Sequence, residues 1–144
     1  MEKKYNQDDI PINWKYCFNV ACPMKDHCLP FQSALEIPQE RTWGHAVFPS
    51  ACHDGQCDYF RKDEPVTLAT GFVVSGQPEL NTMFVRMRRH LTAYLGGQGT
   101  YYLYRNGKKW LSPAQQETIR QMLGKAGFRG EVCFGITKQG YDFT

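Results

Sequence analysis

Apolar residues recur with helical spacing in two stretches of the second half of the chain. Over residues 79–95 they lie three or four positions apart and form one stripe, which predicts a helix that ends at Gly96 and Gly97. The stripe consists of Leu80, Met83, Phe84, Met87, Leu91, Tyr94 and Leu95. A narrower stripe follows Ser112 and Pro113, an N-cap residue and a proline suited to the first helical position, and predicts a second helix.

Runs of β-branched and aromatic residues predict strands around these helices. Residues 66–74 and 131–137 form two such runs, and we expect a turn after the second of them. A third run, 100–105, is followed by Asn106-Gly107 and predicts a hairpin with a type I′ turn. The resulting order is typical of an α+β fold in which two helices cover one face of a small, mainly antiparallel sheet.

The first part of the chain shows neither helical nor strand periodicity. Residues 14–64 are rich in proline, cysteine, histidine and aromatic residues, and a segment of this kind needs a staple because packed elements alone cannot stabilise it. A short helix is expected over residues 24–35, although Pro30 is unfavourable inside it. We therefore predict an N-terminal arm (1–13), a cysteine-rich metal-binding segment (14–64) and an α+β body (65–144) that together form one compact unit.

Length and composition narrow the class of protein. A chain of 144 residues with 42% hydrophobic residues can bury one core. It contains no run of about 18 apolar residues that would span a membrane, and its first residues lack the apolar region of a secretory signal. We therefore expect a cytoplasmic protein without a membrane partner. In a reducing cytosol its cysteines are predicted to bind metal rather than to form disulfides.

Five of the six cysteines lie between residues 17 and 57, with the spacings Cys-x4-Cys-x5-Cys and Cys-x4-Cys. Thiolates bind Zn²⁺ tetrahedrally, and closed sites take four ligands. We expect one zinc ion bound by Cys17, Cys22, Cys28 and Cys57, with Cys52 as the reserve ligand. Because a catalytic zinc needs an open coordination position, an all-cysteine set predicts a structural site.

Other sets of metal ligands are also possible. The Asp54-Gly55 dipeptide predicts a tight turn that brings Cys52 and Cys57 inward together, so that the two could act as a pair. The adjacent His27 and His53 could each replace a thiol, although we expect them to support a ligand or to face solvent.

A [4Fe–4S] cluster is the alternative to zinc. It also takes four thiolates, and Cys22-Pro23 is similar to the Cys-Pro that ends some ferredoxin motifs. The Cys-x2-Cys-x2-Cys run of those motifs is missing, and zinc is therefore favoured. The sixth cysteine, Cys133, lies in a predicted strand and is expected to be a small buried apolar residue.

The cysteine pattern also resembles a known family. The matching residues are Cys17-Phe-Asn-x-x-Cys22-Pro-x4-Cys28-Leu, Cys57-x-Tyr-Phe-Arg61, Pro65-Val66, Gly71-Phe72, Tyr101-Tyr102-x-Tyr104-Arg105-x-Gly107 and Leu111-Ser112-Pro113-x-x-Gln116. This pattern is similar to that of a small family of uncharacterised bacterial proteins, a domain of unknown function. The resemblance implies no activity, and it favours Cys57 over Cys52 as the fourth ligand.

The chain contains no phosphate-binding glycine loop and no nucleophile elbow, so we expect a binding module rather than an enzyme. Its charge is uneven, with a net −3 over residues 1–64 and +6 over residues 65–144. Basic residues next to tyrosines suggest nucleic-acid binding. The candidate contacts are Arg86, Arg89, Arg105, Lys108 and Lys109. The alternatives are an ordinary solvated face, an iron–sulfur protein with a redox or sensing role, and a protein-interaction adaptor.

Overall fold

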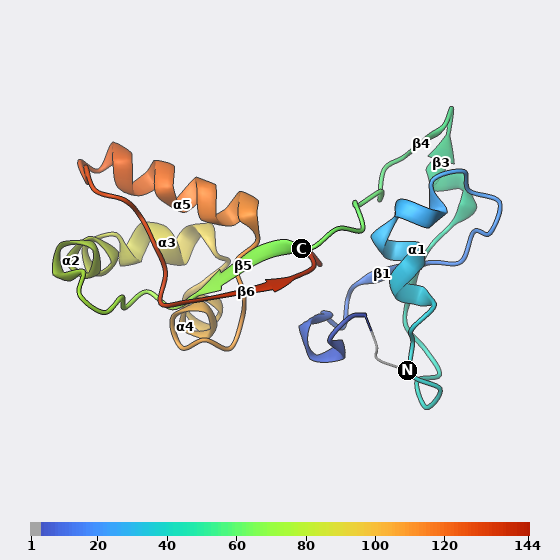
Figure 1. The fold of residues 1–144 in the computed structure, drawn as a ribbon, viewed down its shortest axis with the longest axis horizontal. Helices are drawn as coiled ribbons and strands as arrows, with labels where there is room; N and C mark the ends of the chain where they lie inside the picture. Colours follow the sequence, from blue (N-terminus) through green and yellow to red (C-terminus); the bar gives the residue numbers. More distant parts are fainter. Residues whose placement is uncertain (1–3) are drawn as a thin grey trace. The chain divides into compact units, whose positions relative to one another are not determined.

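The computed structural model describes residues 4–144 and confirms an α+β fold with small sheets (Figure 1). The chain forms two compact units. The first comprises Met1–Pro65 together with Tyr141–Thr144, and the second comprises Val66–Gly140. In the part of the chain that the structure describes, no helix is long and apolar enough to cross a membrane.

The first unit consists mainly of turns and short elements. In chain order they are the 3₁₀ helix η1 (Gln7–Asp9), β1 (Lys15–Cys17), η2 (Lys25–His27), α1 (Leu29–Ala34), β2 (His45–Val47), η3 (Pro49–Ala51), β3 (Cys52–His53) and β4 (Gln56–Cys57). Strands β1 and β2 pair in parallel, whereas β3 and β4 form an antiparallel hairpin. The predicted helix over 24–35 is therefore wrong in extent: the chain forms η2 and then α1, with Pro30 in the first turn of α1, where a missing N–H is tolerated.

The core of the first unit is small and aromatic. It contains Tyr5, Trp14, Tyr16, Leu29 and Phe143. The ring centroids of Trp14 and Phe143 lie 5.0 Å apart in an edge-to-face arrangement, which aromatic rings favour. Residues 4–13 belong to this unit, because Tyr5 is only 2% exposed. The remainder of the predicted arm, residues 1–3, lies outside the described residues.

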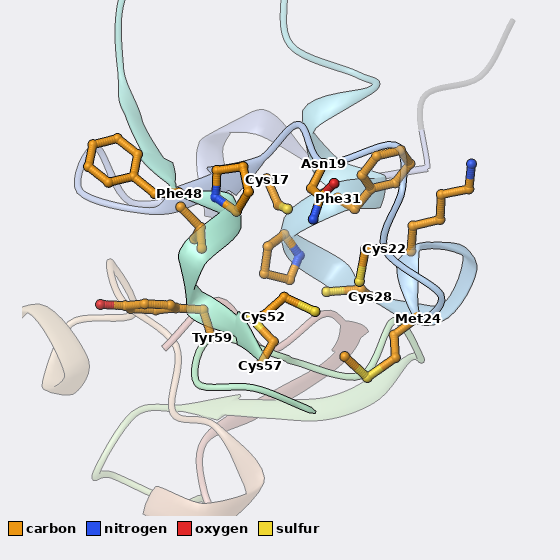
Figure 2. A pocket seen from close by; sticks show the side chains of 14 residues that line it. Cys17, Asn19, Cys22, Met24, Cys28, Phe31, Phe48, Cys52, Cys57 and Tyr59 are labelled. Carbon is orange, nitrogen blue, oxygen red and sulfur yellow. The ribbon is translucent and has the colours of Figure 1, made fainter. Parts of the chain in front are cut away.

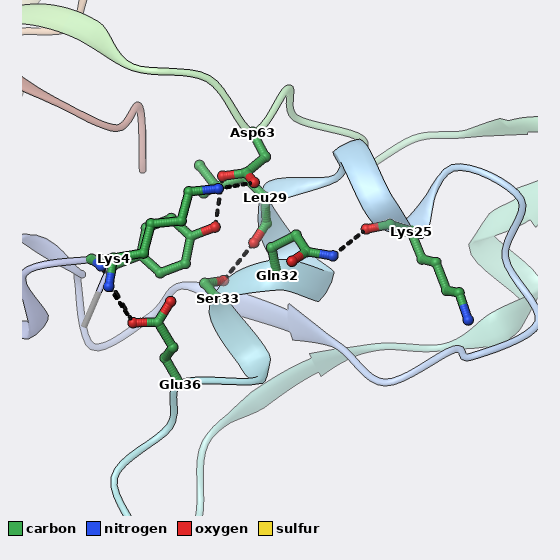
Figure 3. Close-up of polar contacts among 8 residues, drawn as sticks. Lys4, Lys25, Leu29, Gln32, Ser33, Glu36 and Asp63 are labelled. Atoms are coloured by element: carbon green, nitrogen blue, oxygen red, sulfur yellow. Dashed lines mark hydrogen bonds and ion pairs between the residues drawn. The ribbon is translucent and has the colours of Figure 1, made fainter. Parts of the chain in front are cut away.

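Polar contacts tie distant parts of the first unit together (Figure 3). Asp63 accepts hydrogen bonds from the phenol of Tyr5 and the ammonium of Lys4, both at 2.6 Å. The hydroxyl of Ser33 donates to the Leu29 carbonyl at 2.6 Å and accepts from the indole N–H of Trp14 at 3.1 Å. These bonds satisfy polar groups that the core would otherwise bury unpaired.

The second unit holds four helices and a two-stranded antiparallel sheet. Its elements are β5 (Val66–Thr70), α2 (Pro78–Arg86), α3 (Arg88–Tyr94), α4 (Gln98–Arg105), α5 (Pro113–Lys125) and β6 (Ile136–Gly140). Helix α5 packs against β5, and α3 contacts both α2 and α4 (Figure 1). The prediction of only two helices in this body is therefore wrong.

The two predicted helices are present. The stripe over residues 79–95 forms α2 and α3, which meet at Met87, and backbone hydrogen bonds of 2.9 Å from Met87 to Met83 and from Leu91 to Met87 continue across the junction. Helix α5 begins with a capping box, in which the Ser112 hydroxyl accepts from the Gln115 N–H and the Gln115 amide accepts from the Ser112 N–H.

The predicted hairpin around residue 106 is wrong. Residues 100–105 belong to α4, because helical spacing places Tyr101 and Tyr104, each 3% exposed, together in the core. The Asn-Gly pair ends this helix instead of forming a type I′ turn. Gly107 has φ 76°, and the N–H of Lys108 donates to the Leu103 carbonyl at 2.8 Å, as in a Schellman motif.

The last strand also lies later than predicted. Strand β6 covers Ile136–Gly140 and pairs with β5, with Ala69 opposite Thr137, so no turn occurs at Gly140. Val132 and Phe134, which the sequence places in the strand, are buried at 7% exposure but belong to an irregular segment. Their hydrophobicity reflects burial in the core and not sheet pairing.

Candidate metal centre

All five cysteines of the first unit line one pocket (Figure 2). The five are Cys17, Cys22, Cys28, Cys52 and Cys57, and the cavity that they line has a volume of about 20 Å³. Figure 2 shows Cys52 and Cys57 next to each other on their hairpin, with Cys22 and Cys28 together on the neighbouring segment. The structure thus brings the four predicted ligands and the reserve ligand to the same place.

Local structure positions each of the three N-terminal thiols differently. Cys17 is the last residue of β1. The N–H of Cys22 donates to the Asn19 carbonyl at 3.2 Å, and Asn19 also accepts from the following turn through its side chain. Cys28 precedes α1, where the neighbouring N–H of Leu29 donates to the Arg61 carbonyl at 2.7 Å.

The β3–β4 hairpin positions the other two thiols. Asp54 has φ 53° and Gly55 has φ 74°, the positive values that a two-residue type I′ turn requires. The tight turn predicted from Asp54-Gly55 is therefore confirmed. It places Cys52 directly opposite Cys57 in the ladder, and both side chains line the cavity.

Two thiols of the pocket have raised pKa values, which favours their protonated form in the absence of a cation. Burial raises the pKa of Cys28, although backbone hydrogen bonds oppose the shift. The pKa of Cys52 is also raised, by desolvation first and then by a hydrogen bond with the Cys22 side chain. A bound cation would reverse this preference, because a coordinating thiol gives up its proton.

The cysteines surround the cavity without converging on one point. Among residues 4–144, no group of three or more His, Cys, Asp or Glu side chains stands close enough to hold an ion as the side chains are placed. Binding an ion would therefore require the thiols to rotate toward the centre of the cavity. His27 and His53 are exposed and do not line the pocket, so neither replaces a thiol in this arrangement.

Carboxylates and histidines are absent from the described lining, and the non-cysteine residues are mostly apolar. Phe31, Val47, Phe48 and Pro49 are among them. The thioether of Met24 and the amide of Asn19 also reach the pocket. The sixth cysteine, Cys133, lies in the second unit, where it is half-buried and packs against the core.

The predicted nucleic-acid contacts are exposed. They are Arg86, Arg89, Arg105, Lys108 and Lys109. Within residues 4–144, none of the five lies within ion-pair distance of a carboxylate. Two of them lie over tyrosine rings: Arg105 is 5.7 Å from the ring centroid of Tyr102, and Lys109 is 5.5 Å from that of Tyr104.

Most of the tyrosines near these cations are closed to stacking: Tyr101 and Tyr104 are each 3% exposed, and Tyr102 is half-buried. A further arginine, Arg88, belongs to the same region. It acts with Arg105 to lower the pKa of Tyr101 against the larger, opposite effect of burial. Arg88 is not among the five candidate contacts, although it precedes Arg89 in the same basic run and is exposed at the start of α3.

Fold and pocket together define a class of two-unit α+β proteins in which one unit carries a cysteine-lined cavity. The chain belongs to DUF6078, a family of unknown function whose model matches residues 1–143. The resemblance to a domain of unknown function is thereby confirmed. No curated protein and no solved structure matches the chain.

Proposed function

We propose that this protein is a non-catalytic binding module whose first unit is held together by one zinc ion. The ligands are the thiolates of Cys17, Cys22, Cys28 and Cys57, with Cys52 in reserve. The observation that carries the proposal is that thiols from three separate segments line one small cavity. A cavity lined by five thiols is expected for a metal site and has no use in an ordinary apolar core.

The size of the cavity favours a single ion over an iron–sulfur cluster. A volume of about 20 Å³ is close to the space that one water molecule occupies. A mononuclear zinc site needs no more than this, whereas a [4Fe–4S] cluster carries eight inorganic atoms. A cluster would need a wider cavity than the five thiols line, so it is the alternative and not the leading cofactor.

The chemistry of the lining favours a structural role. Four thiolates complete the coordination of Zn²⁺ and leave no position for water or substrate. The buried apolar side chains of Phe31 and Val47 lie beside the thiols. The ion would link β1, the start of α1 and the β3–β4 hairpin, which are too short to stabilise one another by backbone pairing alone.

For the partner of the module we propose the phosphate backbone of nucleic acid. The support is the set of exposed cations of the second unit that lack carboxylate partners, together with the net +6 charge of residues 65–144. Because Tyr101 and Tyr104 are buried, base stacking is not part of this proposal. A protein partner is the alternative, favoured by the exposed aromatic rings of Trp43 and Phe48 at 68% and 77%.

Elemental analysis and a visible spectrum of the protein purified without added metal test the zinc proposal. We expect one equivalent of zinc and a colourless solution, and a brown, iron-containing protein would instead support the cluster. Replacing Cys22 with serine should weaken zinc retention, because the reserve ligand Cys52 must then complete the set of four thiolates. The matched control, Cys133→Ser, also removes one thiol but should retain zinc, because Cys133 lies in the second unit.

Salt dependence tests the nucleic-acid proposal. Binding to mixed-sequence single-stranded DNA should weaken as salt rises, and replacing Lys108 with glutamine should reduce the log–log slope by about 0.7. The exposed Lys125 at the end of α5 provides a matched control, for which we expect no change. Binding that is independent of salt would contradict the proposal.

A further inference from the structure

The pocket holds one thiol more than a closed zinc site uses. Five cysteines line it, and four complete a tetrahedral shell. Two of the five, Cys52 and Cys57, differ from the others because they lie directly opposite each other on one hairpin. Their relation is therefore fixed by two strands and a turn, and does not depend on a bound ion.

The hairpin geometry suits a covalent bond between these two residues. In a two-residue hairpin the pair flanking the turn exchanges backbone hydrogen bonds, so the next pair is a non-hydrogen-bonded one. Cys52 and Cys57 form that next pair. The Cα atoms of such pairs are about 4.5 Å apart, which lies within the range of about 4.4–6.8 Å that disulfides span.

We propose that Cys52 and Cys57 are a redox pair, in which oxidation by a peroxide forms a cross-strand disulfide on the β3–β4 hairpin. With hydrogen peroxide, one thiolate attacks an oxygen, the O–O bond breaks, and a sulfenic acid and hydroxide form. The second thiolate then attacks the sulfenic sulfur, the S–S bond forms, and the sulfenic oxygen leaves as water after protonation. Each thiol gives up one electron and one proton, and the peroxide is reduced to two waters.

This reaction would change the capacity of the pocket for metal. Oxidation removes both hairpin thiols and leaves Cys17, Cys22 and Cys28, one fewer than a closed tetrahedral site requires. The disulfide would thus release the ion, and reduction would restore the site. The release step rests on the proposed zinc site, whereas the disulfide itself does not, because the hairpin holds the two cysteines opposite each other without metal.

A different pairing competes with this one. The side chains of Cys22 and Cys52 are close enough to form a hydrogen bond, so oxidation could join these two residues instead. Because trypsin cleaves after lysine and arginine, the two possible disulfides would be found in different peptides. Trypsin leaves Cys52 and Cys57 on one peptide, residues 42–61, whereas Cys17 and Cys22 lie on residues 16–25.

The test uses the full chain, both metal-free and zinc-loaded, treated with hydrogen peroxide, alkylated and digested with trypsin. We expect peptide 42–61 to carry an internal disulfide that dithiothreitol removes, and peptide 16–25 to be alkylated twice. A crosslink between the two peptides, or alkylation of both cysteines in 42–61, would overturn the proposal. In the zinc-loaded chain, zinc captured by a chromophoric chelator should appear in proportion to the disulfide.

Two kinds of variant complete the experiment. Cys57→Ser should abolish the internal disulfide, and Cys133→Ser should not affect it. Gly55→Ala changes only the turn, since a Cβ at this position meets nothing within 4 Å but the φ of 74° is unfavourable for alanine. It should slow disulfide formation several-fold, and an unchanged rate would overturn the role of the hairpin. Zinc release without the internal disulfide would refute the redox pair but not the proposed zinc site. An internal disulfide in a protein that retains no metal would refute the zinc site but not the redox pair.

Discussion

Removing the proposed zinc ion should destabilise the first unit and leave the second unchanged. All five pocket cysteines belong to the first unit, and the second unit contains only Cys133. A ligand that binds the folded state alone stabilises it by about 2.7 kcal/mol when its free concentration is 100 times its dissociation constant. For a unit of roughly 70 residues, each kcal/mol corresponds to about 4–8 °C, so chelation should lower the melting temperature of the first unit by about 10–20 °C.

Amide hydrogen exchange with and without a zinc chelator measures this effect in each unit separately. The N–H of Leu29, which donates to the Arg61 carbonyl at 2.7 Å beside Cys28, reports on the first unit. The N–H of Leu91, bonded to Met87 at 2.9 Å in α3, reports on the second. We expect protection at Leu29 to fall by up to about 100-fold, which is the free energy above expressed as a ratio, and protection at Leu91 to remain.

Two results would refute this reasoning. Unchanged protection at Leu29, in protein from which elemental analysis shows the metal to be gone, would mean that the ion does not stabilise the unit. An equal loss at Leu29 and Leu91 would mean that the effect is not local to the pocket. Cys28→Ser should shift the chelator response to lower chelator concentrations, because the reserve ligand Cys52 must then complete the site, whereas Cys133→Ser should respond as the unmodified chain does.

The remaining predictions concern the fold. Gly107→Ala places a Cβ on a residue with φ 76° and should cost about 1–2 kcal/mol in denaturant unfolding; no loss would contradict its role in ending α4. Ser33→Ala leaves the buried indole N–H of Trp14 without a partner and should cost about 1–3 kcal/mol. The exposed control Thr82→Ala should cost less than about 0.5 kcal/mol. Burial and a hydrogen bond to a carboxylate raise the pKa of Tyr5. As pH rises above about 10, the phenol therefore loses its proton in the unfolded chain before it does so in the folded chain. The free energy of unfolding should then fall with rising pH. We expect this fall to be steeper than in Tyr5→Phe by up to about 1.4 kcal/mol per pH unit.

The sequence predicted best those elements whose local and tertiary preferences agree. Helix α5 has a capping box, a proline in its first turn and an apolar stripe, and all three place its start at the same residue. The turn at Asp54 and Gly55 was equally predictable, because few dipeptides adopt positive φ at both positions. In both cases the information lies within a few residues of the element that it specifies.

The failures occurred where long-range packing decides the outcome. Thr100, Tyr101, Tyr102 and Tyr104 all favour strands, yet a helix places two of the rings in the core, and that burial outweighs a propensity difference of about 1 kcal/mol. The Asn106-Gly107 pair then serves equally well as a helix end, since both a Schellman motif and a type I′ turn need positive φ at glycine. Local sequence alone cannot separate these uses.

The candidate site also combines features that local sequence predicts with features that only long-range packing decides. The sequence identifies five unusual thiols, but their spacing alone does not show which of them meet, because residues 29–51 could place the second pair anywhere. In the structure, β2 pairs in parallel with β1, so Val47 lies beside Cys17, and the following turn brings Cys52 back to the same pocket. The parallel pairing is a long-range contact that no local pattern encodes. This sheet has only three residue pairs. A metal bound by Cys17 at the end of β1 and by the hairpin that follows β2 would stabilise the pairing on which the site itself depends. Because of this mutual dependence, we expect chelation to affect the whole first unit rather than the pocket alone.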